Sequence, residues 1–357
     1  MPEPLKNRYS REYLQDLAAS LKRHHPEFND MAFVNDVLAD SWSALELKAR
    51  MRRIAETLHA HLPVDFATAA ALLSHSSRDF SGFEAMFFPE YVGLYGLEHH
   101  DLSMQALQVM TRYSSAEFAV RPFIVKDQPR MMGQMLEWSR SPDHHLRRLA
   151  SEGCRPRLPW AMALPDFKRD PSPILPILHN LRNDPSDYVY RSVANNLNDI
   201  SRDHPDLVLQ IANRWKDESA TTAWVVKHAC RSLLRQGDRR ALDLFGFDQP
   251  DHVQLQDFEL AEQVAIGDRL RFAFTLASDV PLGPCRLEYR IHYLKSNGEL
   301  SGKVFKISES NITARVRRVE REHSFRPVST RVLYRGGHAI DVLVNGHKLA
   351  SGVFELV

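Results

Sequence analysis

Cysteine is scarce in this sequence. Its three cysteines, Cys154, Cys230 and Cys285, are odd in number and lie far apart, which excludes both a disulfide framework and the paired spacing of a structural zinc site. Reduced, unpaired thiols are typical of proteins in a reducing compartment. We therefore expect a cytoplasmic location.

Long apolar runs are missing as well. The first eight residues, Met1–Arg8, contain no apolar segment that would act as a signal peptide, and no stretch approaches the length that crosses a bilayer. We therefore expect no contact with a membrane.

The sequence also lacks an excess of charge of one sign. Its 357 residues include 46 lysines and arginines and 45 aspartates and glutamates, a formal net charge of +1. Bulk charge therefore does not indicate a polyanionic partner. A site for such a partner must come from a local arrangement of arginine and lysine.

Motifs for cofactor and metal chemistry are absent. The sequence has no glycine-rich phosphate loop, Gly-x-Ser-x-Gly elbow or cysteine pair. Its histidine pairs, His24-His25, His99-His100 and His144-His145, are sequence neighbours, and neighbouring side chains point about 100° apart on a helix. They do not form the i, i+4 pair that a zinc-binding helix offers. We expect neither a cofactor nor a metal.

Amphipathic helices account for most of what is present. From Ser10 to about Phe245 the apolar residues recur at helical spacing, as in the stretch 44–62. Prolines such as Pro122 and Pro142 cut this region into short helices. Candidate helix caps include Ser10, Asp65, Asp101 and Asp143. The pattern predicts an all-helical array.

Three segments of this array can be laid over one another: 146–153, 190–197 and 225–232. Each has a small alanine with apolar residues before it and basic residues interleaved, and a weaker match surrounds Ala106. The marker alanines are Ala106, Ala150, Ala194 and Ala229. Their spacings of 44, 44 and 35 residues lie in the range of two-helix HEAT-like repeats. Such repeats stack into an α-solenoid with a concave binding face.

The hydrophobic period changes from 3.6 to 2 around residues 247–251. The stretches 269–276 and 287–293 alternate, and Asn297-Gly298 and Asn345-Gly346 are strong hairpin turns. About seven short strands in roughly 100 residues predict an immunoglobulin-like β-sandwich. The predicted chain is therefore multidomain, with a HEAT-like helical domain at 1–250 and the sandwich at 251–357.

Three residues stand out in the chain that follows the aligned helices. They are Glu117 after the Ala106 helix, Trp160 after the Ala150 helix and Asp199 after the Ala194 helix. Because successive repeats stack side by side, related positions should gather two carboxylates and an indole on one surface. Each residue also has a plain structural explanation, as a solvated helix end, a helix N-terminal charge or a core indole.

A proline-bracketed loop carries Arg155 and Arg157 close to Trp160. Guanidinium groups in such a loop can bind phosphates, and the indole can stack on a sugar or a base. Basic residues on the aligned helices would extend this DNA-binding track: Arg147, Arg148, Arg191, Lys227 and Arg231. A solvated, charged helix face explains any one of these five equally well.

The segments 147–160 and 184–199 resemble the AlkC branch of the AlkC/AlkD DNA alkylation-repair glycosylases. The resemblance extends to the sandwich, because members of that branch are HEAT-like repeat proteins and some carry a C-terminal immunoglobulin-like domain. It implies that Glu117 and Asp199 are the catalytic carboxylates and that Trp160 is the active-site tryptophan. Trp160 and Asp199 lie in long matching motifs, whereas Glu117 rests on the shorter segment 114–118.

The function implied by this resemblance is that of a monofunctional hydrolase of base excision repair. It would cut the N-glycosidic bond of 3-methyladenine and 3-methylcytosine in duplex DNA. A base methylated at N3 is cationic and leaves as a neutral group, so the enzyme must stabilise the cationic sugar. Two carboxylates do this electrostatically while one holds the attacking water, and an indole face adds a cation–π contact. We expect duplex DNA with alkylated bases as the partner, and a monomer.

Two other functions also fit a helical array. One is a non-catalytic HEAT-like scaffold that binds a protein, and the other is a protein that binds damaged DNA without cutting it. A scaffold has no reason to gather two acids and an indole among arginines. The sequence leaves open whether the lesion is rotated out of the duplex or read while stacked, although the resemblance favours stacking. It also leaves open whether the arginine-rich stretch 315–335 grips DNA or protects a strand edge.

Overall fold

The computed structural model describes residues 4–328 and 331–357, and these residues form two compact units. The first unit comprises the chain up to Asp203 together with Asp217–Val225, and the second comprises His204–Lys216 and Val226–Val357. The division passes through a single helix, α14 (Ala220–Ala229). Across the described residues, none of the helices combines the length and apolar character needed to cross a bilayer.

The first unit is helical throughout. Its α-helices are α1 (Arg11–His24), α2 (Asp30–Leu38), α3 (Leu47–His61), α4 (Phe66–Ser76), α5 (Phe87–Tyr95), α6 (His100–Met110), α7 (Val120–Lys126), α8 (Gln128–Trp138), α9 (His144–Gly153), α10 (Pro165–Arg169), α11 (Leu175–Leu181) and α12 (Asp187–Ile200). Short 3-10 helices lie at η1 (Leu5–Arg8), η2 (Trp42–Ala44), η3 (Ser77–Asp79) and η4 (Phe83–Met86).

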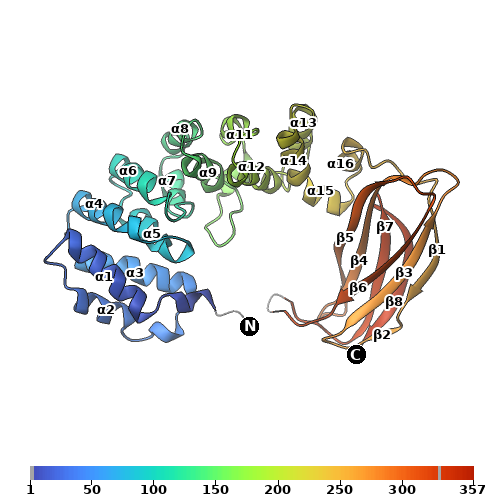
Figure 1. Ribbon diagram of the computed structural model, residues 1–357, viewed down its shortest axis with the longest axis horizontal. Helices are drawn as coiled ribbons and strands as arrows, with labels where there is room; N and C mark the ends of the chain where they lie inside the picture. The colour runs from blue at the N-terminus through green and yellow to red at the C-terminus, as the bar shows by residue number, and fades with distance from the viewer. Residues whose placement is uncertain (1–3, 329–330) are drawn as a thin grey trace. The chain divides into compact units, whose positions relative to one another are not determined.

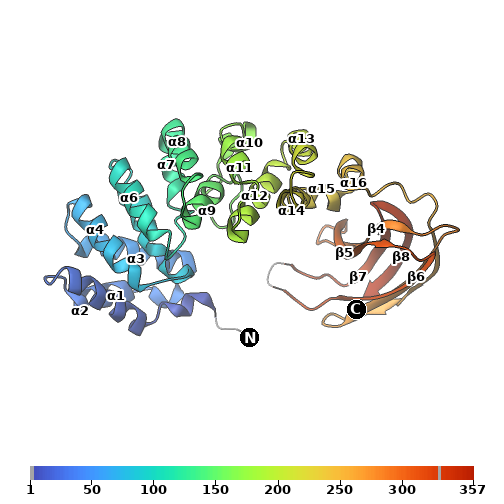
Figure 2. The same cartoon turned by 45° about the horizontal axis from the view of Figure 1, so that its top comes forward.

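These helices form the two-layered array of a HEAT-like solenoid (Figures 1 and 2). Helices α4, α6, α8 and α11 form one row, and α5, α7, α9 and α12 form the other. Polar contacts between buried side chains join neighbours in the second row, because Ser151 Oγ of α9 lies 2.7 Å from Ser192 Oγ of α12. Asn196 Nδ2 of α12 also donates to the Ser151 carbonyl at 2.8 Å. The α-solenoid predicted from the repeats is confirmed.

The register of the first repeat differs from the prediction. Ala150 and Ala194 lie on α9 and α12, which pack against each other in one row, whereas Ala106 lies on α6, which belongs to the other row together with α4. The helix that precedes α9 in its own row is α7, which begins at Val120. The weak sequence match around Ala106 therefore aligned a helix of one layer with helices of the other.

Capping side chains start several of these helices where the sequence indicated. Ser10 accepts a hydrogen bond from the Tyr13 amide, Asp65 from the Thr68 amide and Asp143 from the His145 amide. The cap predicted at Asp101 is wrong, because α6 begins at His100 and places Asp101 in its first turn, where a carboxylate still favours the helix dipole.

The second unit contains a β-sandwich and a few short helices. Its strands are β1 (Gln254–Leu260), β2 (Gln263–Val264), β3 (Arg269–Ala277), β4 (Gly283–Leu294), β5 (Leu300–Ile312), β6 (Val316–Ser324), β7 (Gly336–Val344) and β8 (His347–Leu356). One sheet has the order β1-β3-β6 and the other the order β2-β8-β7-β4-β5. Its complete helices are α13 (Pro205–Trp215), α15 (Arg231–Gln236) and α16 (Arg239–Leu244).

The predicted sandwich is confirmed in its strands and turns. The described part of this unit has eight strands, one more than expected, because the two-residue strand β2 pairs in parallel with β8. Asn297-Gly298 joins β4 to β5, and Asn345-Gly346 joins β7 to β8 with φ values of 49° and 81°. Positive φ at both turn residues is what a tight hairpin of this hand requires. Apolar side chains from both sheets, including Phe274 and Ile291, fill the core between them.

The helices near residue 230 are joined to the sandwich by an ion pair and by an apolar contact. Arg286 of β4 donates to Glu288 and to Glu309, each at 2.6 Å, and Lys227 of α14 forms a further ion pair with Glu309. Leu242 of α16 also lies against the Gly346 turn. The sandwich therefore packs with chain segments that precede residue 250, and its first strand begins at Gln254.

Candidate active site

Asp199 lies in the last turn of α12, inside the helix and not in the chain that follows it. The carboxylate is 4% exposed, and both of its oxygens accept hydrogen bonds from Arg155: Oδ2 from Nε at 2.9 Å and Oδ1 from Nη2 at 3.3 Å. Burial raises the pKa of Asp199, and the Arg155 guanidinium opposes that rise. Such a two-point ion pair fixes the direction of the carboxylate.

Glu152 of α9 is a buried acid that was not predicted from the sequence. Its Oε1 accepts from Arg155 Nη1 at 2.7 Å and lies 3.5 Å from Arg148 Nη2. Burial alone would raise its pKa, but the guanidiniums of Arg148 and Arg155 hold the pKa of Glu152 below its ordinary value. Its spacing of four residues from Arg148 and three from Arg155 is the signal that would have revealed it.

Glu117 lies in the chain between α6 and α7, ahead of the α7 helix. Arg148 Nη1 forms an ion pair with its Oε2, and Ser115 Oγ donates to the same oxygen at 2.7 Å. Arg148 Nη1 also lies 2.7 Å from Ser115 Oγ. Glu117 is thus held by two donors from two different parts of the first unit.

These contacts join into one continuous series of alternating charges, which we call the ion-pair ladder. Its members in order are Glu117, Arg148, Glu152, Arg155 and Asp199. Glu152 in the middle has two guanidinium partners, whereas Glu117 and Asp199 at the ends have one each. The two acids predicted from the sequence are therefore the less neutralised ones. The ladder links the α6–α7 connection to α9 and α12.

Trp160 is presented to solvent by the loop between α9 and α10. Its side chain is 61% exposed and its backbone adopts φ +65°, a left-handed conformation that costs a bulky residue about 1–3 kcal/mol. The Lys48 ammonium donates to the Trp160 carbonyl, and the Phe83 ring meets the indole edge-to-face with centroids 5.5 Å apart. A strained, exposed indole held by two other segments is a feature of binding sites more than of cores.

A hollow of about 320 Å³ adjoins Glu117. Its walls combine acid, base and rings: Phe83, Tyr113, Glu117, His145, Arg148 and Tyr188. Arg148 stacks over the Tyr188 ring at 4.9 Å. Since Phe83 also contacts Trp160, the indole and the Glu117 end of the ladder border the same region of the first unit.

Four of the arginines predicted to bind DNA form two pairs with different surroundings. Arg148 and Arg155 are ladder members with acidic partners, and Arg155 is only 7% exposed. Arg157 and Arg191 reach the surface, where Arg157 pairs with Asp203 at 2.7 Å and Arg191 with Asp187 at 3.4 Å. Arg191 also stacks over Trp224 at 5.3 Å. The geometry therefore favours phosphate contacts by Arg157 and Arg191.

Three other predicted basic residues have structural partners. Arg147 donates to both oxygens of Asp184, at 2.6 and 3.0 Å, and so joins α9 to the turn before α12. Lys227 and Arg231 belong to the second unit, where Lys227 pairs with Glu309 and Arg231 donates to the His228 carbonyl at 2.8 Å. These contacts give each of the three a role in packing.

The histidine pair at 144–145 differs from the sequence expectation. The two rings lie 4.1 Å apart, and with Asp143 they form a group whose polar atoms lie within 4.8 Å of one another. Both Asp143 oxygens are already engaged, Oδ1 by the His145 amide and Oδ2 by Arg112 at 2.6 Å. A cation there would have to displace the Arg112 guanidinium.

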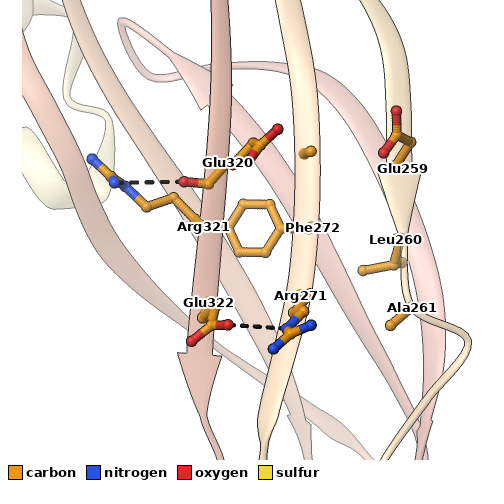
Figure 3. Close-up of a pocket in the computed structure, with 9 residues that line it drawn as sticks. Glu259, Leu260, Ala261, Arg271, Phe272, Glu320, Arg321 and Glu322 are labelled. Carbon is orange, nitrogen blue, oxygen red and sulfur yellow. Dashed lines mark hydrogen bonds and ion pairs between the residues drawn. The ribbon is translucent and has the colours of Figure 1, made fainter.

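A larger hollow, of about 800 Å³, lies on the three-stranded sheet of the second unit (Figure 3). Two of its acids have arginine partners: Glu322 accepts from Arg271 at 3.0 Å, and Glu259 accepts from Arg318, a residue outside the lining, at 2.7 Å. Ala273, between Glu259 and Glu320 in the register, leaves the space open. Paired, exposed charges on a strand face are what an ordinary sheet surface contains.

Known proteins match both units. A family model described as DNA alkylation repair enzyme matches residues 29–233, and one described as the C-terminal Ig-like domain of uncharacterised protein YhaZ matches residues 254–357. The Bacillus subtilis protein YhaZ is 43% identical over 354 residues, which is 99% of either chain. The structure of Pseudomonas fluorescens alkylpurine DNA glycosylase AlkC, bound to DNA containing an abasic site analog, has a TM-score of 0.95 at 39% identity. That match covers 99% of this chain and 100% of the other. The chain thus belongs to the DNA alkylation repair enzyme family, in the branch that contains AlkC.

Proposed function

We propose that this protein is a monofunctional DNA glycosylase that excises cationic N3-methylated bases from duplex DNA, with 3-methyladenine and 3-methylcytosine as its substrates. The observation that carries the proposal is the ion-pair ladder, whose two end acids lie in the same helical unit as an exposed tryptophan. Membership of the family and the similarity to the AlkC glycosylase support the same activity.

The ladder suits a reaction in which positive charge moves from the base to the sugar. When the N-glycosidic bond breaks, its electron pair neutralises the cationic base, which leaves without a general acid. Positive charge then develops at the sugar, where ionised carboxylates aimed in advance stabilise it. Arg155 holds Asp199 and Arg148 holds Glu117 in fixed directions, so neither acid has to reorganise during the reaction.

Asp199 is the acid we assign to the water. A water oxygen forms the new bond to C1′ as the base departs, and its proton passes to a carboxylate or to solvent. Burial raises the pKa of Asp199, which makes it a better proton acceptor than an ordinary aspartate. Glu117, held by Ser115 and Arg148, is assigned to electrostatic stabilisation of the sugar.

Trp160 supplies an aromatic face and contact with the duplex. Its indole is exposed on a loop that also carries Arg157, so base or sugar contact and phosphate contact arise from one segment. Arg191 would bind a second phosphate. We propose duplex DNA with an alkylated base as the partner of a monomeric enzyme that requires neither metal nor cofactor.

The direct test is release of free base from duplex DNA carrying a single 3-methyladenine, 3-methylcytosine or 7-methylguanine. We expect release of the first two and strand breaks only after treatment that cleaves abasic sites. Tight binding of the lesion duplex with no base released would instead identify a damage-binding protein. Absence of both binding and release would leave the scaffold function.

A further inference from the structure

Arg121 is the largest of the fully buried side chains, with no exposed surface. It lies at the start of α7, and it donates to three backbone carbonyls: Nη1 to Gly153 O at 2.8 Å and to Arg155 O at 2.9 Å, and Nε to Met162 O at 2.7 Å. Within the described chain no carboxylate forms an ion pair with it, and Nη2 has no hydrogen-bond partner. A buried guanidinium whose hydrogen bonds go only to backbone carbonyls, with no carboxylate partner, is unusual in a protein interior.

The three carbonyls mark both ends of the loop that presents Trp160. Gly153 and Arg155 lie where the chain leaves α9, and Met162 lies where the chain returns toward α10. One side chain from a different helix therefore closes the base of the loop. The planar guanidinium carries several N–H donors that point in different directions, so it can bind carbonyls at both ends of the loop. The compact ammonium group of a lysine cannot do this.

The loop has few internal means of holding this shape. Pro156 and Pro159 carry no amide donor, and the loop's own backbone hydrogen bonds are long, from Ala161 to Leu158 O at 3.3 Å and from Leu164 to Pro156 O at 3.2 Å. Trp160 moreover occupies the left-handed region, which persists only when surrounding contacts impose it. The cross-link from Arg121 is such a contact.

The hydrogen bond from Arg121 also fixes the backbone of Arg155, from which the Arg155 side chain extends. Arg121 holds the Arg155 carbonyl, while the Arg155 guanidinium reaches Glu152 and Asp199 in the ladder. A shift of the loop base would move the indole and the partner of Asp199 together. The positions of the Trp160 indole and of the Asp199 carboxylate therefore both depend on Arg121, a buried residue that does not touch the substrate.

Stability alone does not account for a charge in this place. Burial lowers the pKa of Arg121 to about 10, so the group stays protonated at neutral pH in surroundings that disfavour its charge. An apolar side chain of similar volume would remove that desolvation penalty. We propose that Arg121 is a positioning residue, which sets the geometry of Trp160 and of the Arg155–Asp199 pair; this rests on the proposed glycosylase function.

The chain offers a matched control for this proposal. Arg50 of α3 is also buried, at 7% exposure, and likewise donates to three carbonyls: Leu45 O at 3.1 Å, Lys6 O at 2.8 Å and Ser43 O at 3.4 Å. Those carbonyls belong to the N-terminal segment and to the turn before α3, and none belongs to the Trp160 loop. Arg50→Ala should therefore reduce stability without changing the chemistry.

The experiment compares Arg121→Ala, Arg121→Lys and Arg50→Ala in the full-length protein. Single-turnover release of 3-methyladenine and the dissociation constant for the lesion duplex are measured for each variant. Arg121→Ala should lower the rate about 100-fold, because small displacements of reacting groups have effects of this size, and duplex affinity should change much less. Arg121→Lys should be nearly as slow, since lysine restores the positive charge but not the planar set of donors of the guanidinium. Guanidinium ion at millimolar concentration should restore part of the rate to Arg121→Ala and none to Arg50→Ala.

Hydrogen exchange of peptides covering residues 154–164 gives a readout that needs no activity. Exchange in this segment should accelerate in Arg121→Ala and Arg121→Lys and stay unchanged in Arg50→Ala. Unchanged exchange, a wild-type rate in Arg121→Lys, or equal losses of rate in Arg121→Ala and Arg50→Ala at equal melting temperature would each overturn the proposal. If the wild-type protein releases no methylated base, the glycosylase function fails, and exchange still decides whether Arg121 holds the loop.

Discussion

Arg155 holds Asp199 by both carboxylate oxygens, across a separation of 44 residues in the sequence. The pair is buried, and the same guanidinium also binds Glu152 at 2.7 Å. With its donors directed to two acids, Arg155 is placed to orient the carboxylate of Asp199, which we propose as catalytic, and not to bind a phosphate. This assignment replaces the phosphate contact expected from its place beside Trp160.

Asp199→Asn should nearly abolish base release and leave duplex binding largely intact, because the change removes a charge but little volume. The neutral amide would still fit the Arg155 site with one acceptor oxygen. Single-turnover release and duplex affinity, measured side by side, check this. Asp166→Asn, which alters an exposed acid paired with Arg169, is the control. Lost binding with an unchanged chemical rate would rule out the catalytic role.

Arg155→Met should move the acidic limb of the pH–rate profile to higher pH. Burial raises the pKa of Asp199 and Arg155 opposes that rise, so removal of the guanidinium raises the pKa further. Because the reaction needs the ionised carboxylate, the rate falls as the pH drops through this pKa, and it falls earlier in the variant. The wild-type limb should itself lie above the range of an ordinary aspartate.

The profile is measured from single-turnover rates at constant ionic strength. Arg147→Met, which removes an arginine paired with Asp184 outside the ladder, serves as the control and should leave the limb in place. An unchanged limb in Arg155→Met would mean that Asp199 is not the group whose ionisation controls the rate. Loss of one partner from a buried pair also destabilises a protein by about 3–5 kcal/mol, so folding is verified by thermal melting.

Arg157→Ala should weaken binding to duplexes of all sequences to a similar extent. Arg157 is partly exposed and its ion pair with Asp203 can yield to a phosphate. Loss of one phosphate contact should make the plot of log affinity against log salt shallower by about one unit. Binding titrations at several salt concentrations test this, with Arg169→Ala, an exposed arginine paired with Asp166, as the control. A loss that depends on sequence would contradict the assignment.

A chain that ends at Asp251 should retain the helical fold of the first unit but lose order after about Val226. Lys227 would lose Glu309, and Leu242 would lose the Gly346 turn that covers it. If the arginine-rich stretch 315–335 contacts DNA, the fragment should also lose much of its base-release rate. Circular dichroism, hydrogen exchange of residues 226–250 and base release separate these effects. A fully active fragment would reduce the sandwich to an accessory.

The sequence by itself determined the class and order of the elements. The change of hydrophobic period near residue 250 separates helices from strands because the two structures bury side chains with different repeats. Local chemistry likewise placed the Asn345-Gly346 turn, since few other residue pairs accept its backbone angles. Trp160 was found for a similar reason: two prolines and a tryptophan in one short segment stand out without any knowledge of neighbours.

Only the tertiary structure decided what these residues contact. The two outer ion pairs of the ladder join side chains that are 31 and 44 residues apart, and the sequence pattern does not state which guanidinium meets which carboxylate. The layer occupied by Ala106 was missed because helices of both rows have similar apolar stripes, and only packing distinguishes them. Arg121 reads in the sequence as an ordinary surface charge at a helix start. It is buried because three carbonyls of a distant loop replace water as its hydrogen-bond partners.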